Sequence, residues 1–175
     1  MKNFSFLKDI EDFLILLFKH QVKYLIVGGE AVIYYGYARI TGDIDIFYEN
    51  SEENCKKLFE ALYEFWKGKI PGIKDHSELM EPKSIFQFGV PPNRIDLINY
   101  ITKISFKSAW EERVCEKLKV KNKNFKIYYI GLKDLIKNKN ALKRPKDLED
   151  LKYLNKIKRK RLKKDYGKKT GKTIL

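Results

Sequence analysis

Cysteine and histidine are scarce in this sequence of 175 residues, which has two of each. Cys55 and Cys115 lack the spacing of metal ligands, and His20 and His76 do not cluster with them. A conventional zinc site built from cysteine and histidine is therefore excluded. Two isolated cysteines also favour reduced thiols, as in proteins of the cytosol.

Long apolar runs are missing as well. The longest is FLILLF, from Phe13 to Phe18, whereas a membrane-spanning helix needs about 20 apolar residues. The N-terminal stretch MKNFSFLKDIED carries acids where the apolar part of a secretory signal would begin, so we expect a cytoplasmic protein that uses no membrane. Apolar residues still make up 43% of the chain and aromatic residues 14%, which is enough for the core of one domain.

Acidic residues are outnumbered, 23 against 37 basic residues, which gives a net charge of +14. The excess is concentrated at the end: residues 155–175 hold ten basic residues and one acid, a charge of +9, which leaves +5 for the other 154 residues. Such a block is either a solvated tail or a contact for phosphate backbones. Composition alone does not choose between these interpretations.

Helix and strand patterns alternate along the chain. Ser51 and Pro145 are suited to helix starts, and Pro91-Pro92-Asn93 is suited to the turn of a hairpin. The patterns predict helices over residues 5–20, 30–36, 51–66, 105–113, 132–142 and 145–158, and strands over residues 23–29, 43–49, 84–90, 94–100 and 126–131.

This alternation predicts the α+β (mixed α/β) class, with one mixed sheet flanked by helices. We expect a single domain over residues 1–154, including C-terminal helices from about residue 132. Residues 155–175 would form a basic tail, either flexible or a helical extension of the domain.

Two acids interrupt an otherwise apolar strand at DIDIFYE. On a strand, Asp43 and Asp45 point to the same face with Cα atoms roughly 6.5 Å apart, so their carboxylates would repel unless a cation lies between them. Asp96, in RIDLI, is a third acid of this kind, and three converging carboxylates would suit two divalent metal ions. The alternative is a pair of acids that face solvent from an edge strand.

A glycine pair stands directly before this region. Gly28 and Gly29 follow the strand YLIV and open a short helix, where free backbone N–H groups and the absence of side chains would let a polyphosphate approach closely. The glycine turn and the acids together predict a site for a metal-bound nucleoside triphosphate.

The same residues resemble known motifs. GGEA…YGYARITGDIDI is similar to the first motif of the polymerase-β-like nucleotidyltransferase superfamily, in particular of the minimal nucleotidyltransferases related to AbiEii-type toxins. GVPPNRIDLI resembles the strand that carries the third acid, and LIKNKNALKRPKDLEDL resembles the C-terminal segment. The resemblance spans residues 24–151 and implies the nucleotidyltransferase fold, a mixed sheet flanked by helices with a C-terminal helical segment.

The resemblance also implies an activity, the transfer of a nucleoside monophosphate from an NTP to a hydroxyl acceptor with release of pyrophosphate. It implies Mg²⁺ or Mn²⁺ as cofactor, two ions with bound NTP, and an acceptor on tRNA, another RNA or a protein. A role as toxin, with an antitoxin protein as partner, is a further expectation. The alternatives are a catalytically silent nucleotide- or RNA-binding relative and a basic RNA-associating module.

Residue roles follow from the same resemblance. Asp43, Asp45 and Asp96 would be both metal ligands and catalytic residues, and Lys139 would be catalytic. We prefer Lys139 to Lys137 because it stands five residues before Arg144, as the motif spacing suggests. The NTP would be bound by Gly28, Gly29, Arg39, Thr41, Arg144 and Asp147.

Some residues have a second interpretation. Arg39 could instead pair with Glu49. Asp147 and Asp150, judged from the residues alone, are expected on a helix surface or in the first turn of a helix. The polymerase-β-like motif often has serine where this chain has Glu30, and we expect Glu30 to point away from the phosphates. Core packing is expected for Ile85, Phe86 and Phe88, and is favoured over base stacking for Tyr34, Tyr35 and Tyr37.

Overall fold

The computed structural model describes residues 6–170, with side chains through Lys163, and it has the alternating order of elements that the sequence predicts. In chain order the elements are α1 (Lys8–Lys19), β1 (Tyr24–Val27), α2 (Gly28–Tyr34), β2 (Asp43–Tyr48), α3 (Glu52–Phe65), the 3₁₀ helix η1 (His76–Met80), β3 (Ile85–Phe88), β4 (Arg94–Ile98), α4 (Phe106–Glu111), β5 (Val114–Val120), β6 (Lys123–Tyr129), α5 (Leu132–Leu142) and α6 (Pro145–Thr170).

Two of the predicted helix starts are confirmed. The Ser51 hydroxyl accepts a hydrogen bond from the N–H of Asn54 at the start of α3, which satisfies a backbone donor that the helix leaves free. Pro145 is the first residue of α6, where its missing N–H costs nothing. The sequence patterns did not predict β5 and η1.

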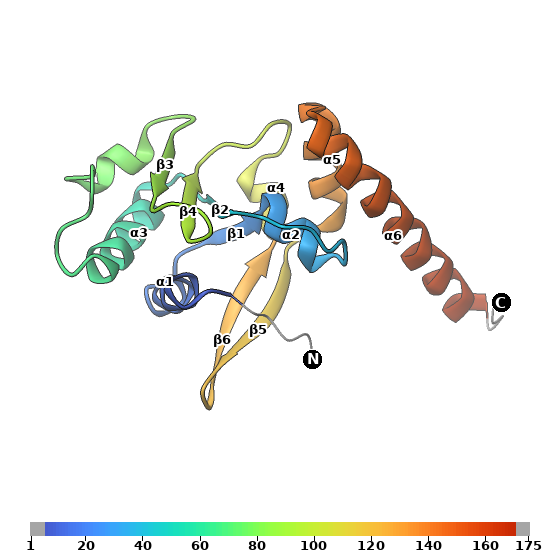
Figure 1. The fold of residues 1–175 in the computed structure, drawn as a ribbon, viewed down its shortest axis with the longest axis horizontal. Helices are drawn as coiled ribbons and strands as arrows, with labels where there is room; N and C mark the ends of the chain where they lie inside the picture. Colours follow the sequence, from blue (N-terminus) through green and yellow to red (C-terminus); the bar gives the residue numbers. More distant parts are fainter. Residues whose placement is uncertain (1–5, 171–175) are drawn as a thin grey trace.

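The described strands form one six-stranded sheet in the order β3-β4-β2-β1-β6-β5 (Figure 1). The pairs β2–β4 and β1–β6 are parallel and the other three are antiparallel, so the sheet is mixed as expected. The predicted hairpin is present as β3 and β4. The parallel pairing of β2 and β4 sets Asp45 opposite Asp96, although the two residues are far apart in sequence.

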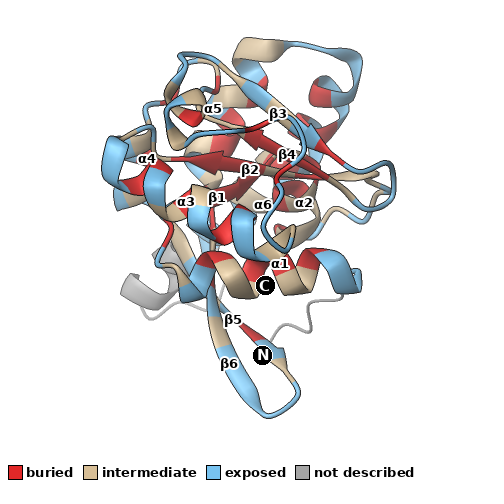
Figure 2. Ribbon diagram, turned by 90° about the vertical axis from the view of Figure 1, so that its left-hand side faces the viewer, coloured by how far each residue is buried: buried red, intermediate tan, exposed pale blue. Residues whose placement is uncertain are grey.

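The two faces of this sheet differ in character. Strand β2 sends Ile44 and Ile46 into the hydrophobic core and leaves Asp43 and Asp45 half-buried on the opposite face. The core is completed by buried residues of α1 and α3, which appear red in the burial-coloured ribbon (Figure 2). The two helices also touch each other through an edge-to-face contact of Phe13 and Phe65.

One expected core residue is not in the core. Ile85 is 64% exposed, because β3 is an edge strand and Ile85 lies on the same face as the acids. Phe86 and Phe88 alternate to the opposite face, where they pack against or within the core as predicted.

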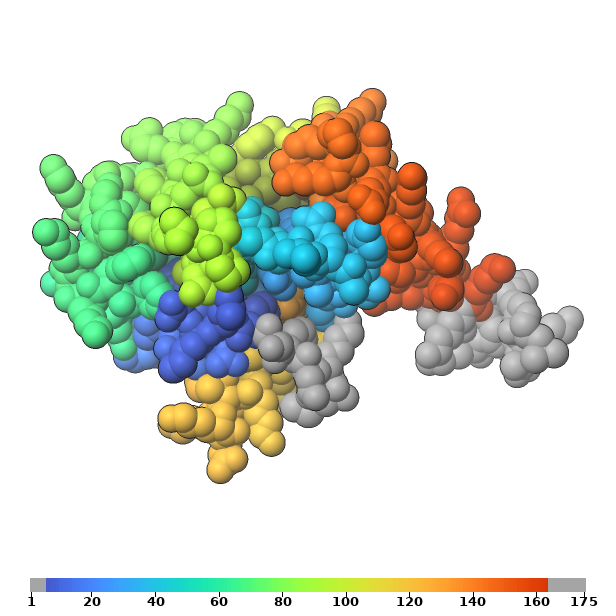
Figure 3. All heavy atoms as spheres, in the orientation of Figure 1, coloured from blue at the N-terminus to red at the C-terminus, as the bar shows by residue number. Residues whose placement is uncertain are grey.

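The C-terminal helices lie beside the sheet and then leave it. Lys143 adopts a left-handed conformation (φ 54°) that ends α5, and α6 starts two residues later. Helix α6 extends beyond the body of the molecule, as does the β5–β6 hairpin (Figures 1 and 3). Residues 155–170 of the predicted tail belong to α6, and residues 171–175 lie outside the described residues. Within residues 6–170, no helix combines the length and the apolar character needed to cross a membrane.

Candidate active site

Asp43, Asp45 and Asp96 lie together on one face of the sheet. Strands β2 and β4 run in parallel with Asp43 opposite Arg94 and Asp45 opposite Asp96, so all four side chains share this face. They line one cavity of about 340 Å³. Its wall also includes six other residues considered so far: Gly28, Gly29, Ile85, Arg39, Lys139 and Arg144.

The glycine turn fits tightly against these acids. Gly28 has φ +61°, and a Cβ atom there would lie 1.8 Å from the carboxylate of Asp45. A Cβ atom on Gly29 would lie 2.6 Å from the hydroxyl of Thr41 and 2.9 Å from the guanidinium of Arg39. Gly28 therefore needs glycine for both its positive φ and the close approach of Asp45, whereas a side chain at Gly29 would require Thr41 and Arg39 to move.

The three neighbouring carboxylates make the electrostatic potential in the cavity more negative, which disfavours the ionised form of Asp45. Burial raises the pKa of Asp45 to about 6, and the neighbouring charges of Asp43 and Asp96 add to the effect, while Lys146 opposes it. Burial also raises the pKa of Glu30, with the charge of Asp43 as the next cause. A carboxylate cluster that resists ionisation in this way is an environment that favours a bound cation.

The guanidinium of Arg94 provides part of the positive charge that these carboxylates favour. Its Nε donates to Asp96 Oδ1 at 3.0 Å and its Nη2 to Asp96 Oδ2 at 3.1 Å, and Nη2 also pairs with Asp43 Oδ2. Gln87 donates to Asp96 Oδ2 at 3.2 Å from the neighbouring strand. The sequence analysis missed Arg94, although its position two residues before Asp96 on a strand places it on the acidic face.

The donor set suits a hard divalent cation, because Mg²⁺ and Mn²⁺ prefer carboxylate oxygens. In the part of the chain that the structure describes, however, no three His, Cys, Asp or Glu side chains are grouped closely enough to hold a metal ion. Arg94 binds two of the three expected ligands. The residues therefore fit a metal by their chemistry, and an ion held by all three carboxylates would have to displace Arg94 from both Asp43 and Asp96.

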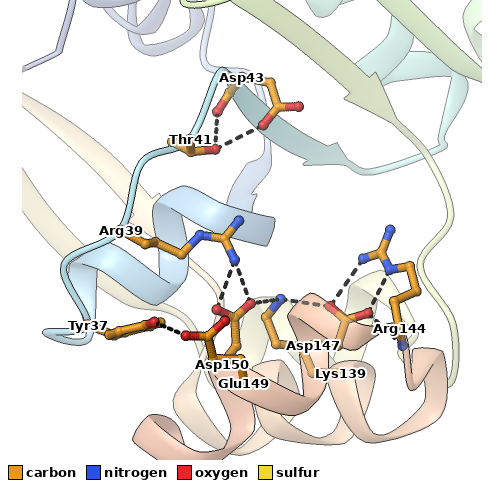
Figure 4. Close-up of polar contacts among 9 residues, drawn as sticks. All are labelled: Tyr37, Arg39, Thr41, Asp43, Lys139, Arg144, Asp147, Glu149 and Asp150. Atoms are coloured by element: carbon orange, nitrogen blue, oxygen red, sulfur yellow. Dashed lines mark hydrogen bonds and ion pairs between the residues drawn. The ribbon is translucent and has the colours of Figure 1, made fainter.

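A buried ionic network lies beside the cavity (Figure 4). Lys139, only 3% exposed, places its ammonium 3.0 Å from Asp147 Oδ1 and 2.7 Å from Asp150 Oδ2. Arg144 donates to Asp147 at 2.6 Å, and Arg39 donates to both oxygens of Asp150 at 2.8 Å. Five charged side chains, from α5, the turn after it, α6 and the segment before β2, are thus joined by ion pairs.

This network corrects two of the interpretations made from single residues. Asp147 does lie in the first turn of α6, but Asp147 and Asp150 are both buried and not on a helix surface, because α6 packs on α5 with these side chains turned inward. Arg39 pairs with Asp150 and not with Glu49, whose partner is Lys23 at 3.2 Å. Asp147 is not part of the cavity wall, and the charges of Arg144 and Lys139 hold its pKa below the usual value despite its burial.

The segment between α2 and β2 is fixed at several points. Tyr37 stacks on Tyr153 of α6, with ring centroids 3.7 Å apart, and its hydroxyl donates to Glu149 at 2.6 Å. At the other end, Thr41 donates to Asp43 Oδ1 at 3.0 Å (Figure 4). Tyr34 and Tyr35 pack against Tyr129 and the backbone of Ile130, so none of these three tyrosines lines the cavity.

Comparison with known families gives one match. The model of a family described as "Nucleotidyltransferase of unknown function (DUF6036)" matches residues 5–166, which include every candidate site residue. None of the curated proteins matches the chain. The mixed sheet flanked by helices agrees with the nucleotidyltransferase fold, which confirms the predicted fold class.

Proposed function

This chain belongs to that nucleotidyltransferase family, and on this basis we propose that it transfers a nucleoside monophosphate from an NTP to a hydroxyl acceptor. The observation that carries the proposal is the shared cavity, in which three carboxylates on one face of the sheet meet a glycine turn and several cationic side chains. A triphosphate needs cations and close backbone approach, and an attacking hydroxyl needs a nearby base.

Each group has a part in this reaction. Asp43, Asp45 and Asp96 would hold Mg²⁺ or Mn²⁺, two ions with bound NTP, whose charge would offset that of the triphosphate. The glycine turn with Arg39 and Lys146 would bind the phosphates at one end of the cavity. Lys139 also lines the cavity and would add positive charge beside the NTP from within its buried ion pairs with Asp147 and Asp150, and Arg144 would contribute charge from the same side.

The step itself is a simple exchange at phosphorus. The acceptor oxygen forms a bond to the α-phosphorus while the bond from that phosphorus to the oxygen bridging to the β-phosphorus breaks, and pyrophosphate leaves. The hydroxyl proton passes to Asp96, whose carboxylate lies at the side of the cavity away from the glycine turn. No covalent enzyme intermediate is needed.

A catalytically silent nucleotide-binding relative is the second candidate, and the position of Arg94 favours it. While Arg94 holds Asp43 and Asp96, two of the three carboxylates are neutralised without a metal. For the active enzyme, Arg94 has to release both Asp43 and Asp96 when metal and NTP bind. The two candidates therefore differ in whether NTP binding is followed by transfer.

The acceptor and the biological role are each proposed from a single observation. An acceptor on RNA, including tRNA, is supported by the basic surface, and membership of a toxin–antitoxin pair by the motif resemblance to AbiEii-type toxins. A cytoplasmic location fits both acceptor classes, RNA and protein.

The test uses each of the four NTPs labelled at the α-phosphate, with Mg²⁺ or Mn²⁺ and with total RNA or cell protein as acceptor. Wild-type protein should label one of these fractions. Asp45→Asn should lose at least about 100-fold in rate, as is typical when an essential electrostatic group is removed. Asp12→Asn, an exposed acid on α1, serves as the matched control and should keep full activity.

Two results would decide against the proposal. Equal transfer by Asp45→Asn and wild type would remove the carboxylates from the mechanism. Binding of a non-hydrolysable NTP analogue with Mg²⁺, seen as a thermal shift, without transfer to any fraction would identify the silent relative instead.

A further inference from the structure

The cavity has two chemically different ends. The sheet order β1-β2-β4-β3 places the Gly28–Gly29 turn at one end, Asp43 and Asp45 next, then Asp96, and finally Ile85 and Gln87 of β3. Arg39 and Lys146 line the same cavity, whereas residues Ile85, Gln87, Ile98, Tyr100, Ile101 and Thr102 of its wall carry no charge. Apart from Arg94 and Asp96 of β4, the wall over β4, β3 and the segment that follows β4 is therefore uncharged, in contrast to the end with Arg39 and Lys146.

If the proposed function holds, the geometry of the reaction shows which end of the cavity takes the pyrophosphate and which takes the acceptor. In phosphoryl and nucleotidyl transfer the attacking oxygen and the leaving oxygen lie roughly in line on opposite sides of phosphorus. When pyrophosphate leaves toward the glycine turn, the acceptor hydroxyl has to arrive from the opposite side, over β4 and β3. The uncharged end of the cavity is therefore where the acceptor enters.

Two large apolar side chains stand exposed at this entrance. Ile85 is 64% exposed and Tyr100, two residues beyond β4, is 48% exposed, and both line the cavity. The ammonium of Lys83 lies 5.3 Å from the centre of the Tyr100 ring. Single exposed apolar residues are common, but here an isoleucine, an aromatic ring and a cation border the side of the cavity that bears Asp96.

We propose that Tyr100 and Ile85 form a platform for the terminal nucleotide of an RNA acceptor, with Lys83 beside its phosphate. A base is flat, stacks on an aromatic ring and tolerates an apolar neighbour, and its phosphate needs a nearby cation. A protein acceptor has no base to stack on Tyr100 and no backbone phosphate to pair with Lys83. The net charge of +14 also favours a polyanionic partner.

The experiment measures RNA and NTP binding separately, by fluorescence anisotropy of a short labelled RNA with a free 3′-hydroxyl and by the thermal shift with a non-hydrolysable NTP analogue and Mg²⁺. Tyr100→Leu should weaken RNA binding about tenfold, corresponding to the loss of one stacked base. Tyr100→Phe should keep wild-type affinity. Lys83→Gln should lower the salt dependence of RNA binding by about one phosphate contact.

Tyr63→Leu is the matched control, because Tyr63 has almost the same exposure, 49%, but lies on α3 and not in the wall of the cavity. Its RNA affinity should equal that of wild type. None of the four variants should change the response to the NTP analogue.

Three outcomes would overturn the platform. They are loss of NTP-analogue binding in Tyr100→Leu with RNA binding unchanged, equal RNA binding by Tyr100→Leu and wild type, and labelling of protein but not RNA by the wild-type enzyme. The first would assign Tyr100 to the base of the NTP. Failure of the nucleotidyltransferase assignment itself would be recognised separately, as undiminished transfer by Asp45→Asn.

Discussion

At the scale of single residues, the main feature of the site is that carboxylates of the same charge lie opposite each other on neighbouring strands. Asp45 and Asp96 lie opposite each other on neighbouring parallel strands, where strand spacing is about 4.8 Å, and Asp43 stands two residues away. Arg94 offsets part of this charge by binding Asp43 and Asp96, but its described ion pairs do not include Asp45. The acid with the largest resolved shift in pKa is accordingly Asp45.

Asp45 therefore destabilises the metal-free protein near neutral pH. Its pKa rises from 3.8 in the unfolded chain to about 6 in the folded protein, so between these values the folded state holds a proton that the unfolded state has lost. The contribution of Asp45 to the free energy of unfolding thus falls as pH rises from about 4 to 6, and remains low above pH 6. The difference corresponds to about 1–3 kcal/mol, at 1.36 kcal/mol for each unit of pKa.

We expect Asp45→Asn to be more stable than wild type at pH 7.5 without divalent metal, and the two proteins to converge near pH 4. Urea unfolding across this pH range, in the presence of a chelator, measures the difference. Equal stability of the two proteins at pH 7.5 would contradict the assigned environment of Asp45. The matched change at an exposed acid, Asp12→Asn, should show no such pH dependence.

Contacts between side chains of neighbouring strands were also the hardest feature of the site to predict. The alternation DIDIF was enough to place Asp43 and Asp45 on one face, because that relation is local. The pairing of Arg94 with Asp43 depends on two strands meeting in parallel, a relation between distant residues. The sequence therefore predicted the acids and missed the cation that binds them.

At the scale of elements, α6 holds the segment that leads into β2. Tyr37 stacks on Tyr153, and Arg39 pairs with Asp150, while the same segment ends in Thr41 bonded to Asp43 (Figure 4). The helix thus fixes the position of Arg39 beside Gly29 from outside the sheet. The acids of this helix had appeared to be surface residues because helical spacing alone does not show which face packs on α5.

We expect Asp150→Asn to lower the free energy of unfolding by about 3–5 kcal/mol, because it leaves Arg39 and Lys139 with one buried partner charge fewer. Glu149→Gln, one residue earlier on the same helix, is the control and should cost less than about 1 kcal/mol, since Glu149 is exposed. Denaturant unfolding of the three proteins at one pH measures both. A cost for Asp150→Asn no larger than that for Glu149→Gln would contradict the buried network.

Strand β5 marks the limit of prediction for whole elements. In the strand sequence VCEKLKV, Leu118 is the only buried residue, and two lysines point to solvent. Edge strands often carry lysine in this way, since it discourages pairing with other chains. The apolar run of β1 and the alternating pattern of β2 predict strands directly. The sequence of this edge strand has no such pattern and does not differ from that of a charged helix or loop.

At the scale of the whole molecule, the positive charge lies on two projections. Five exposed basic residues of α6 line one surface depression together with Asn155: Lys152, Lys156, Arg159, Lys160 and Lys163. The β5–β6 hairpin, which projects from the body of the molecule (Figure 3), carries a second set, with Lys117 directly opposite Lys126 in the strand register. Like charges directly opposite each other on neighbouring strands are unfavourable, so stability alone does not explain the charge of the hairpin.

The projection that contacts RNA can be identified by removing equal charge from each. We expect the α6 variant, with Lys156, Arg159, Lys160 and Lys163 replaced by glutamine, to lose up to about three units of the slope of log affinity against log salt. Helix α6 continues from the Lys146 side of the cavity, so RNA lying along it could reach the active site. The hairpin variant, with Lys117, Lys119, Lys123 and Lys126 replaced, has the same net charge and should lose less than one unit.

Affinity for the NTP analogue should stay at the wild-type level in both variants, because none of the eight replaced residues lines the cavity. Equal slopes in the two variants would mean that RNA responds to the overall charge of +14 and not to α6. A larger loss in the hairpin variant would place RNA at the opposite projection, and the acceptor path along α6 would then be wrong.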